Sequence, residues 1–436
     1  MKKTLLISTT LLLAGGAVAW WLLAAAPGAS RPGPPEEVAA LAPETPIAVR
    51  SGSVFLPPPD SAFAAPTVRE LPLPMVAGGA SVWGATGRDH RGRIYVGVSV
   101  HDAGASPHLF EFDPAGGQWR DRGNPRDELR RVGLLRDGES QVKLHSRIVQ
   151  AADGYLYFAS FDEDGEDQRT HTQPRWGGHL WRMHPERDGW EHLLATPDAL
   201  IAVATTGRHV YALGYFDHVL HVFDTVTGDT RRTVVGAADG HVSRNLVVGA
   251  DEHAFVPRLR AAGGEHRAEL VEFDPALREI AATPLPDYLA GEAPAAHHGI
   301  VAFTWLADDS TVFTTHGGRL YRIRPTPGGA AKVEDAGFMH PAGAAYAPAL
   351  FPFNGESLVA GVARRADGEF EWVVHDLDTG LAGAFPFATS FLPKLLLYGS
   401  VTRDDEGRFY VGGWSDGRPL LLQVDARGAG DAEQAP

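Results

Sequence analysis

The chain of 436 residues contains no cysteine, which excludes disulfide bonds and metal or cluster sites that depend on thiolate ligands. Positive charge is also scarce: 39 Lys and Arg stand against 54 Asp and Glu, a formal net charge of −15. The main basic cluster is DELRRVGLLRD at 127–137. Because nucleic-acid binding relies on basic surfaces, nucleic acid is not an expected partner.

Catalytic signatures are equally scarce. The chain has no G-x-S-x-G nucleophile context, no phosphate-binding glycine loop and no His-Glu-x-x-His or His-x-His pair. The adjacent cysteines typical of quinone-cofactor dehydrogenases are also missing. We find no convincing amphipathic helix after residue 40, so the chain is expected to be built from strands.

An uncharged, mainly apolar run from Thr4 to Ala26 follows two lysines and has the form of an export signal. A small-x-small site at 17–19 permits cleavage before Trp20, whereas 23 residues also suffice to span a bilayer. Residues 1–26 are therefore a signal peptide or an N-terminal membrane anchor. Either form predicts an extracytoplasmic protein, in the periplasm or on the outer face of the inner membrane.

The rest of the chain divides by composition. Residues 27–60 are rich in Pro, Ala and Gly and predict an extended linker. Residues 61–426 form the repeat domain, and residues 427–436 predict a disordered tail.

A repeated motif dominates residues 61–426. Short segments such as GRIYVG, GYLYFA and GRFYVG recur seven times, with a central residue at Tyr95, Tyr157, Tyr211, Phe255, Phe313, Val359 and Tyr410. The spacing of 44 to 62 residues suits one four-stranded sheet per repeat. A second apolar alternation such as HLFEFD or VLHVFD follows each time, usually ends in aspartate and leads into Pro or Thr-Gly turn residues.

The alternation has the period of half-buried strands and predicts an all-β fold, a seven-bladed β-propeller of four-stranded antiparallel blades. The last repeat lacks its fourth strand. Residues 46–57 or 67–76 could supply it and close the ring.

Two motifs, D-x-x-G-x-hydrophobic-Tyr and hydrophobic-x-aromatic-Asp-Pro, resemble the broad β-propeller superfamily with YVTN, quinoprotein-like and WD-like repeats, over roughly residues 60–426. The Gly-His and Trp-Asp signatures of WD repeats are absent, so no specific family is assigned. The resemblance implies the fold and no activity.

Candidate functional residues lie where inner strands begin and where loops connect strands across one face, which we call the top face. In KLHSRIVQ, His145 and Arg147 are two residues apart and therefore on the same side of a strand. Arg244, Asn245, His298 and Tyr398 fall at similar heights on other blades. Together these side chains are expected to converge on the central funnel, where they bind a ligand or simply line a water-filled channel.

Aromatic and charged residues of the top loops extend the candidate binding surface: Trp83, Arg175, Trp176 and Trp414. The longest loop, residues 161–178, contains Arg175 and Trp176 and either has a function or is a solvated flap.

A divalent metal has two candidate positions. His145, His241 and His298 could hold zinc or manganese near the axis, with His297 as a substitute for His298. Asp162, Asp164 and Asp167 have the oxygen spacing of a calcium site, although the remaining EF-hand positions are missing.

Two functions stay in competition. The first is a non-catalytic propeller that binds an unidentified protein or carbohydrate on its top face, and that contacts the membrane through its N-terminal segment if this is uncleaved. The second is a polysaccharide lyase in which His145 is the base, Tyr398 the acid, and Arg147 or Arg244 neutralises a uronate carboxylate.

Overall fold

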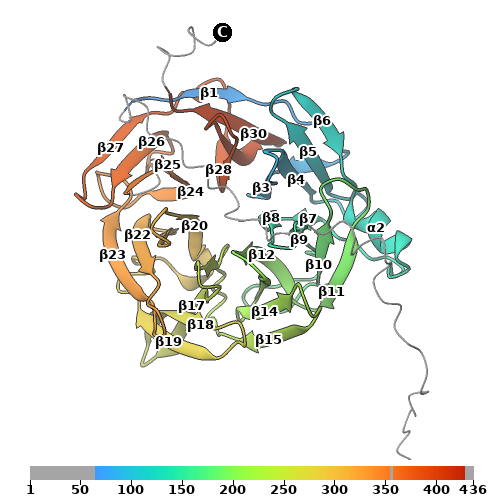
Figure 1. Ribbon diagram of the computed structural model, residues 1–436, viewed down its shortest axis with the longest axis horizontal. Coiled ribbons are helices and arrows are strands. Elements are labelled where there is room, and N and C mark those ends of the chain that lie inside the picture. The colour runs from blue at the N-terminus through green and yellow to red at the C-terminus, as the bar shows by residue number, and fades with distance from the viewer. Residues whose placement is uncertain (1–63, 354–356, 428–436) are drawn as a thin grey trace, which may run out of the picture. The chain divides into compact units, whose positions relative to one another are not determined.

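The computed structural model describes residues 64–353 and 357–427 and contains seven antiparallel blades arranged radially around one axis, the last two of which are joined by a parallel pairing of their inner strands (Figure 1). The predicted seven-bladed propeller is confirmed. From the axis outward, the first blade contains β2 (Gly79–Ser81), β3 (Thr86–Arg88), β4 (Ile94–Val100), β5 (His108–Asp113) and β6 (Gln118–Asp121). The second blade contains β7 (Lys143–Leu144), β8 (Val149–Gln150), β9 (Leu156–Phe161), β10 (Gly178–Met183) and β11 (Glu191–Thr196). The third blade contains β12 (Ala199–Thr205), β13 (His209–Tyr215), β14 (Val219–Asp224) and β15 (Thr230–Val234).

Blades four to seven follow the same order along the chain. The fourth blade contains β16 (Val247–Val248), β17 (Ala254–Ala262), β18 (Glu265–Phe273) and β19 (Glu279–Pro284), and the fifth contains β20 (Ile300–Trp305), β21 (Thr311–Thr315), β22 (Arg319–Arg324) and β23 (Lys332–Phe338). The sixth blade contains β24 (Tyr346–Pro352), β25 (Leu358–Arg364), β26 (Phe370–Asp376) and β27 (Ala382–Pro386). The seventh contains β28 (Leu395–Arg403), β29 (Phe409–Ser415) and β30 (Arg418–Asp425).

The fourth strand of the seventh blade comes from the other end of the chain. β1 (Thr67–Glu70) pairs antiparallel with β30, with Thr67 opposite Asp425 and Glu70 opposite Leu422 (Figure 1). This confirms the prediction that an N-terminal strand closes the ring and selects residues 67–76 as its source. The other candidate, residues 46–57, lies outside the described residues.

The repeated central residues form the core between blades. All seven lie on the second strand of their blade and are at most 1% exposed. Tyr95 belongs to the same buried cluster as Phe158 and Trp181 of the next blade, and the Tyr410 ring lies 6.4 Å from the Phe112 ring of the first blade. The repeat is thus a packing repeat, because a large side chain at this position fills the space between neighbouring sheets.

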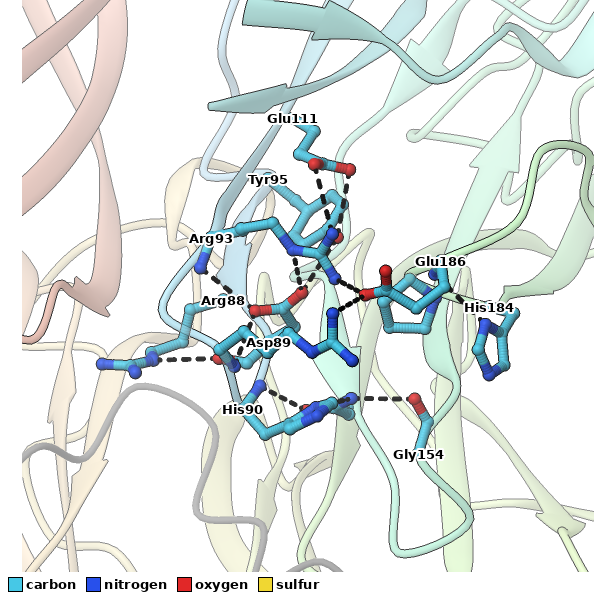
Figure 2. Close-up of polar contacts among 12 residues, drawn as sticks. Arg88, Asp89, His90, Arg93, Tyr95, Glu111, Gly154, His184 and Glu186 are labelled. Atoms are coloured by element: carbon cyan, nitrogen blue, oxygen red, sulfur yellow. Dashed lines mark hydrogen bonds and ion pairs between the residues drawn. The ribbon is translucent and has the colours of Figure 1, made fainter. Parts of the chain in front are cut away.

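A charged network holds the turn before β4 on the bottom face, opposite the top face (Figure 2). Asp89 accepts hydrogen bonds from the backbone N–H groups of Arg91 and Arg93 and from the Arg93 guanidinium, at 2.7–3.0 Å. The same guanidinium pairs with Glu111 and with Glu186 of the second blade (Figure 2). The D-x-x-G-R-x-Tyr motif therefore stabilises a turn and joins two blades, which accounts for it without a catalytic role.

One expectation was wrong. α2 (Pro125–Arg131) is an α-helix in the connection between the first two blades, and a short 3-10 helix, η1 (Pro294–Ala296), precedes the fifth. The side chain of Asn124 accepts a hydrogen bond from the Asp127 N–H at the start of α2, where proline is the first helical residue. These capping signals are readable in NPRDELRR, but seven residues are too few for a helical period to stand out.

No helix within residues 64–353 and 357–427 is long and apolar enough to cross a membrane. The predicted signal or anchor at residues 1–26, the predicted linker at residues 27–60 and residues 428–436 of the predicted tail lie outside the described residues.

Candidate functional site

A funnel opens on the top face around the propeller axis. Its main cavity, of about 220 Å³, is lined by residues of the first five blades and the loop after β9. A space of about 10 Å³, room for about one water molecule, adjoins it and adds lining residues from the seventh blade. The residues that line one or both spaces include most of those predicted from the sequence: Trp83, His145, Arg147, Arg244, Asn245, His298 and Tyr398.

Trp83 is the central wall residue of the funnel. Its ring lies 4.3 Å from the Tyr398 ring and 6.2 Å from the His145 ring, nearly parallel to the latter. The Lys143 ammonium lies 4.5 Å from the Trp83 ring centroid, in cation–π contact. These contacts hold the ring in place, so Trp83 is a fixed part of the funnel wall. Its indole N–H has no hydrogen-bond partner among the described residues.

Two guanidinium groups enter the funnel without an acid partner. Arg147 stacks 3.6 Å above the Phe303 ring and donates only long hydrogen bonds, 3.3 and 3.4 Å, to the Phe303 carbonyl. Arg244 lies 5.6 Å from the Tyr398 ring and 3.4 Å from His298 Nε2, and its Nη1 has no partner within residues 64–353 and 357–427. Within the described part of the chain neither arginine forms an ion pair with a carboxylate. Burial lowers the pKa of Arg147 to about 9.

His145 and His298 of the funnel are neutral near pH 7. Burial, followed by the charges of Arg244 and Lys143, lowers the pKa of His145 to about 3. Burial and then Arg244 lower the pKa of His298 to about 2. His145 Nδ1 donates to the Ile201 carbonyl at 3.2 Å, which leaves a lone pair on Nε2.

A row of imidazole rings extends from the funnel into the protein. Neighbouring rings are 4.7–5.4 Å apart along the series His298, His316, His297, His241 and His218. Both His297 and His298 line the cavity. His297 Nδ1 accepts from the Gly299 N–H, so its Nε2 carries the hydrogen, and Nε2 has no partner among the described residues.

The expected metal group at the axis does not form. Among the described residues, the only three or more metal-ligating side chains with ligand atoms within 4.8 Å of one another are Asp251, His253 and Glu272. His145, His241 and His298 are not such a group, because His241 turns instead toward the Tyr288 hydroxyl and the Pro294 carbonyl. His253 and Glu272 stand where the first blade has its Arg93–Glu111 ion pair, so we interpret that group as a blade-stabilising pair.

The calcium arrangement is also not formed. Asp162 is buried and binds the Ser140 hydroxyl at 2.6 Å, while Asp164 lies beside Arg175 and Asp167 accepts from the Arg169 N–H. Each carboxylate thus points to a different local partner.

The remaining predicted binding residues lie away from the funnel. Trp176 is flanked by the guanidinium groups of Arg136 and Arg175, at 4.9 and 4.7 Å from its ring centroid. Trp414 lies on β29, opposite Leu396 and Pro419, and lines neither funnel space.

Sequence reasoning missed three charged residues that line the main cavity: Lys143, Glu163 and Glu166. Lys143 continues the period-two series of His145 and Arg147, so its position was readable; it pairs with Glu163 at 3.1 Å. Glu166 accepts from the Tyr215 hydroxyl at 2.6 Å, and burial, opposed by that hydrogen bond, raises its pKa to about 7. Nothing in the loop sequence distinguished Glu166 from its acidic neighbours.

No protein-family model matches the chain, and no curated protein is similar to it in sequence. Among solved structures, the β-propeller domain of Cps50 (Swd1) from Myceliophteria thermophila is similar with a TM-score of 0.50 and 10% identity, over 82% of this chain and 99% of that one. U3-55K gives 0.48 and 9% identity, over 84% and 99%. The extracellular domain of the hybrid two-component system BT4673 from B. thetaiotaomicron gives 0.47 and 14%, over 82% of this chain and 39% of that one. At these identities the likeness shows the β-propeller fold alone.

Proposed function

We propose that this propeller binds a small carboxylate-bearing ligand, of the kind found in acidic sugars, in its central funnel. The proposal rests on one observation: the guanidinium groups of Arg147 and Arg244 lie at the funnel wall, and neither forms an ion pair with a carboxylate of the described residues. A guanidinium removed from water costs several kcal/mol unless an anion compensates it. A bound carboxylate supplies that anion and matches the planar fork of arginine.

The other free groups of the funnel favour a ligand rich in oxygen atoms. Trp83 Nε1, Arg244 Nη1 and His297 Nε2 are N–H donors without partners in the part of the chain that the structure describes, and all three residues line the main cavity. Buried donors are normally satisfied, so the funnel offers three N–H groups to acceptors on a ligand. A uronate provides a carboxylate together with hydroxyl and ring oxygens.

Replacing Arg244 by Gln tests the proposal. Binding of glucuronate and galacturonate, measured by titration calorimetry, is expected to weaken at least about tenfold, since a hydrogen bond to a charged group contributes about 1.5–3 kcal/mol. Arg319→Gln is the matched control, because Arg319 also lies over an aromatic ring, Phe338 at 5.4 Å, but pairs with Asp335 outside the funnel. Equal binding by the wild-type protein and the Arg244 variant would contradict the proposal.

A second candidate function, β-elimination of a uronate polysaccharide, is favoured by one observation: His145 and Tyr398 contact the same Trp83 ring beside Arg244. His145 Nε2 has the lone pair to take the C5 proton. As the C4–O bond breaks and the C4–C5 double bond forms, Tyr398, whose pKa burial raises, can give its proton to the leaving oxygen.

If the protein is a lyase, the wild type releases unsaturated uronates, which are detected by their ultraviolet absorbance. The His145→Gln variant is then expected to release none, although it still binds the ligand. Absence of unsaturated product from polygalacturonate, alginate and glycosaminoglycans alike would reject catalysis and leave binding as the function.

We also propose that residues 1–26 direct the propeller out of the cytoplasm, on the strength of the two lysines and the apolar run that follows. Mass spectrometry of the protein from cell envelopes is expected to find Trp20 as the first residue if the segment is cleaved, or peptides upstream of it if it is an anchor. Recovery only from the cytosol, with Met1 in place, would overturn the proposal.

A further inference from the structure

The loop between β9 and β10 forms a fixed wall on one side of the funnel. Glu163, Glu166 and Gln168, all from this loop, line the main cavity. Within the loop, Asp167 and Thr172 form an isolated β-bridge, and buried Asp162 accepts from the Trp176 N–H. The loop is therefore structured along its length, in contrast to the solvated flap considered from the sequence.

Two side chains tie this loop to the next blades. Gln168 Nε2 donates to the Gly240 carbonyl at 2.6 Å and to the Ala295 carbonyl at 2.9 Å, which reaches the connections before the fourth and fifth blades. His171 Nδ1 donates to Asp217 at 3.0 Å, and its Nε2 accepts from the Gly240 N–H at 2.8 Å. The backbones approach closely here, because a Cβ on Gly240 would lie 2.8 Å from the Gln168 carbonyl oxygen.

Below the cavity the channel narrows. The adjoining space of about 10 Å³ has room for about one water molecule, and Arg147 and Asn245 line it. Both are held by backbone carbonyls of the fifth blade, Phe303 for Arg147 and Val301 for Asn245. A ligand that enters from the top face therefore meets a floor and cannot thread through the propeller.

The dimensions limit the ligand to one unit. A volume of about 220 Å³ is below the roughly 300–1,000 Å³ of sites for drug-sized molecules. A segment inside a polysaccharide chain needs an entry and an exit, but the loop wall bounds one side and the floor closes the bottom.

We infer that the funnel takes a single uronate unit, either free or at the end of an acidic polysaccharide, and excludes units inside a chain. This rests on the proposed function of the funnel and adds to it which part of the polymer is bound. The source of the specificity is Gln168, a positioning residue that holds the loop wall against Gly240 and Ala295.

The test compares galacturonate and alginate chains of about 2, 10 and 50 residues by titration calorimetry, with the dissociation constant expressed per mole of chains. Binding at chain ends predicts a constant that stays within about twofold across the series. Binding to interior units predicts no binding of the shortest chain, which has no interior unit, and a decrease of about sixfold in the constant from chains of about 10 to chains of about 50 residues. Free monosaccharide in the same assay shows whether a chain is needed at all.

Gln168→Ala is expected to loosen the wall, so that the dissociation constant of this variant depends on chain length. Gln173→Ala is the control, because Gln173 lies in the same loop but lacks the two anchoring hydrogen bonds. Its dissociation constant is expected to stay independent of chain length, as in the wild type. Affinity that rises with chain length in the wild type would overturn the inference and leave the proposed function intact. A Gln168 variant whose dissociation constant does not depend on chain length would overturn the role given to the loop. Failure of every chain to bind would overturn the proposed function and this inference together.

Discussion

Lowering the pH from 7 to about 4.5 is expected to destabilise the propeller strongly, by on the order of 5 kcal/mol or more. The cause is the buried part of the histidine row. His218, His241 and His297 are at most 1% exposed, and burial is the largest cause that lowers their pKa values to about 3, 4 and 3. One pKa unit corresponds to about 1.4 kcal/mol, so two such residues are enough for an effect of this size.

The direction in which stability changes with pH follows from proton linkage. These folded-state pKa values lie below the ordinary 6.5, so between about pH 6.5 and 3 the unfolded chain binds more protons than the folded one. Stability is therefore fully present above pH 6.5 and is lost as the pH falls toward 3. Hydrogen bonding adds a reason: His218 Nε2 and His297 Nδ1 accept from the backbone N–H groups of Ser243 and Gly299, and a protonated ring cannot accept.

Urea unfolding at pH 7, 5.5 and 4.5 measures the effect. His218→Gln is the informative variant, because a Gln amide can donate to the Pro257 carbonyl and accept from the Ser243 N–H as the imidazole does. It is expected to retain at pH 4.5 about 2 kcal/mol more of its pH 7 stability than the wild type retains. Exposed His90→Gln should follow the wild type. A wild-type free energy of unfolding that is equal at pH 7 and 4.5 would show that the buried imidazoles do not control acid stability.

The fold could be predicted from the sequence because it depends on local periodicity. Residues such as Tyr95, Tyr211 and Tyr410 recur once per blade, and the second strand of every blade was placed correctly. Ring closure was predictable by counting, since the last repeat was one strand short. The helix α2 was missed because its signal lies in the cap at Asn124 and not in a period.

The site was predictable where it lies at the inner edges of the blades. His145, Arg147 and Arg244 lie next to the short inner strands β7, β8 and β16, and the structure brings them to one funnel. The predicted group of three histidines does not form, because the height of a residue on its blade does not determine the direction of its side chain. The His241 ring points toward the Tyr288 hydroxyl instead. The ties of Gln168 join segments 72 and 127 residues apart, and no local pattern reports such contacts.

Replacing Gly87 by Ala is expected to destabilise the propeller by at least about 3 kcal/mol, because it inserts a methyl group where two inner strands touch. Gly87 on β3 forms a parallel bridge with Ile148 of the second blade, and a Cβ at Gly87 would lie 1.8 Å from the Ile148 carbonyl oxygen. The obstacle is backbone, so no side chain can rotate away. Relief requires the first two blades to separate at the axis, next to Arg147 and the funnel floor.

Thermal and urea unfolding of Gly87→Ala measure this cost. Gly329→Ala is the control, since a Cβ there would lie 3.6 Å from the Thr326 methyl group, an ordinary contact distance. Ligand affinity should fall with stability in the Gly87 variant, because the blades that separate include the one that positions His145 and Arg147. A Gly87 variant as stable as the wild type would mean that the inner strands do not meet as closely as the bridge requires. A destabilised variant with unchanged uronate binding would instead place the ligand higher in the funnel, away from Arg147 and in contact with Arg244 alone.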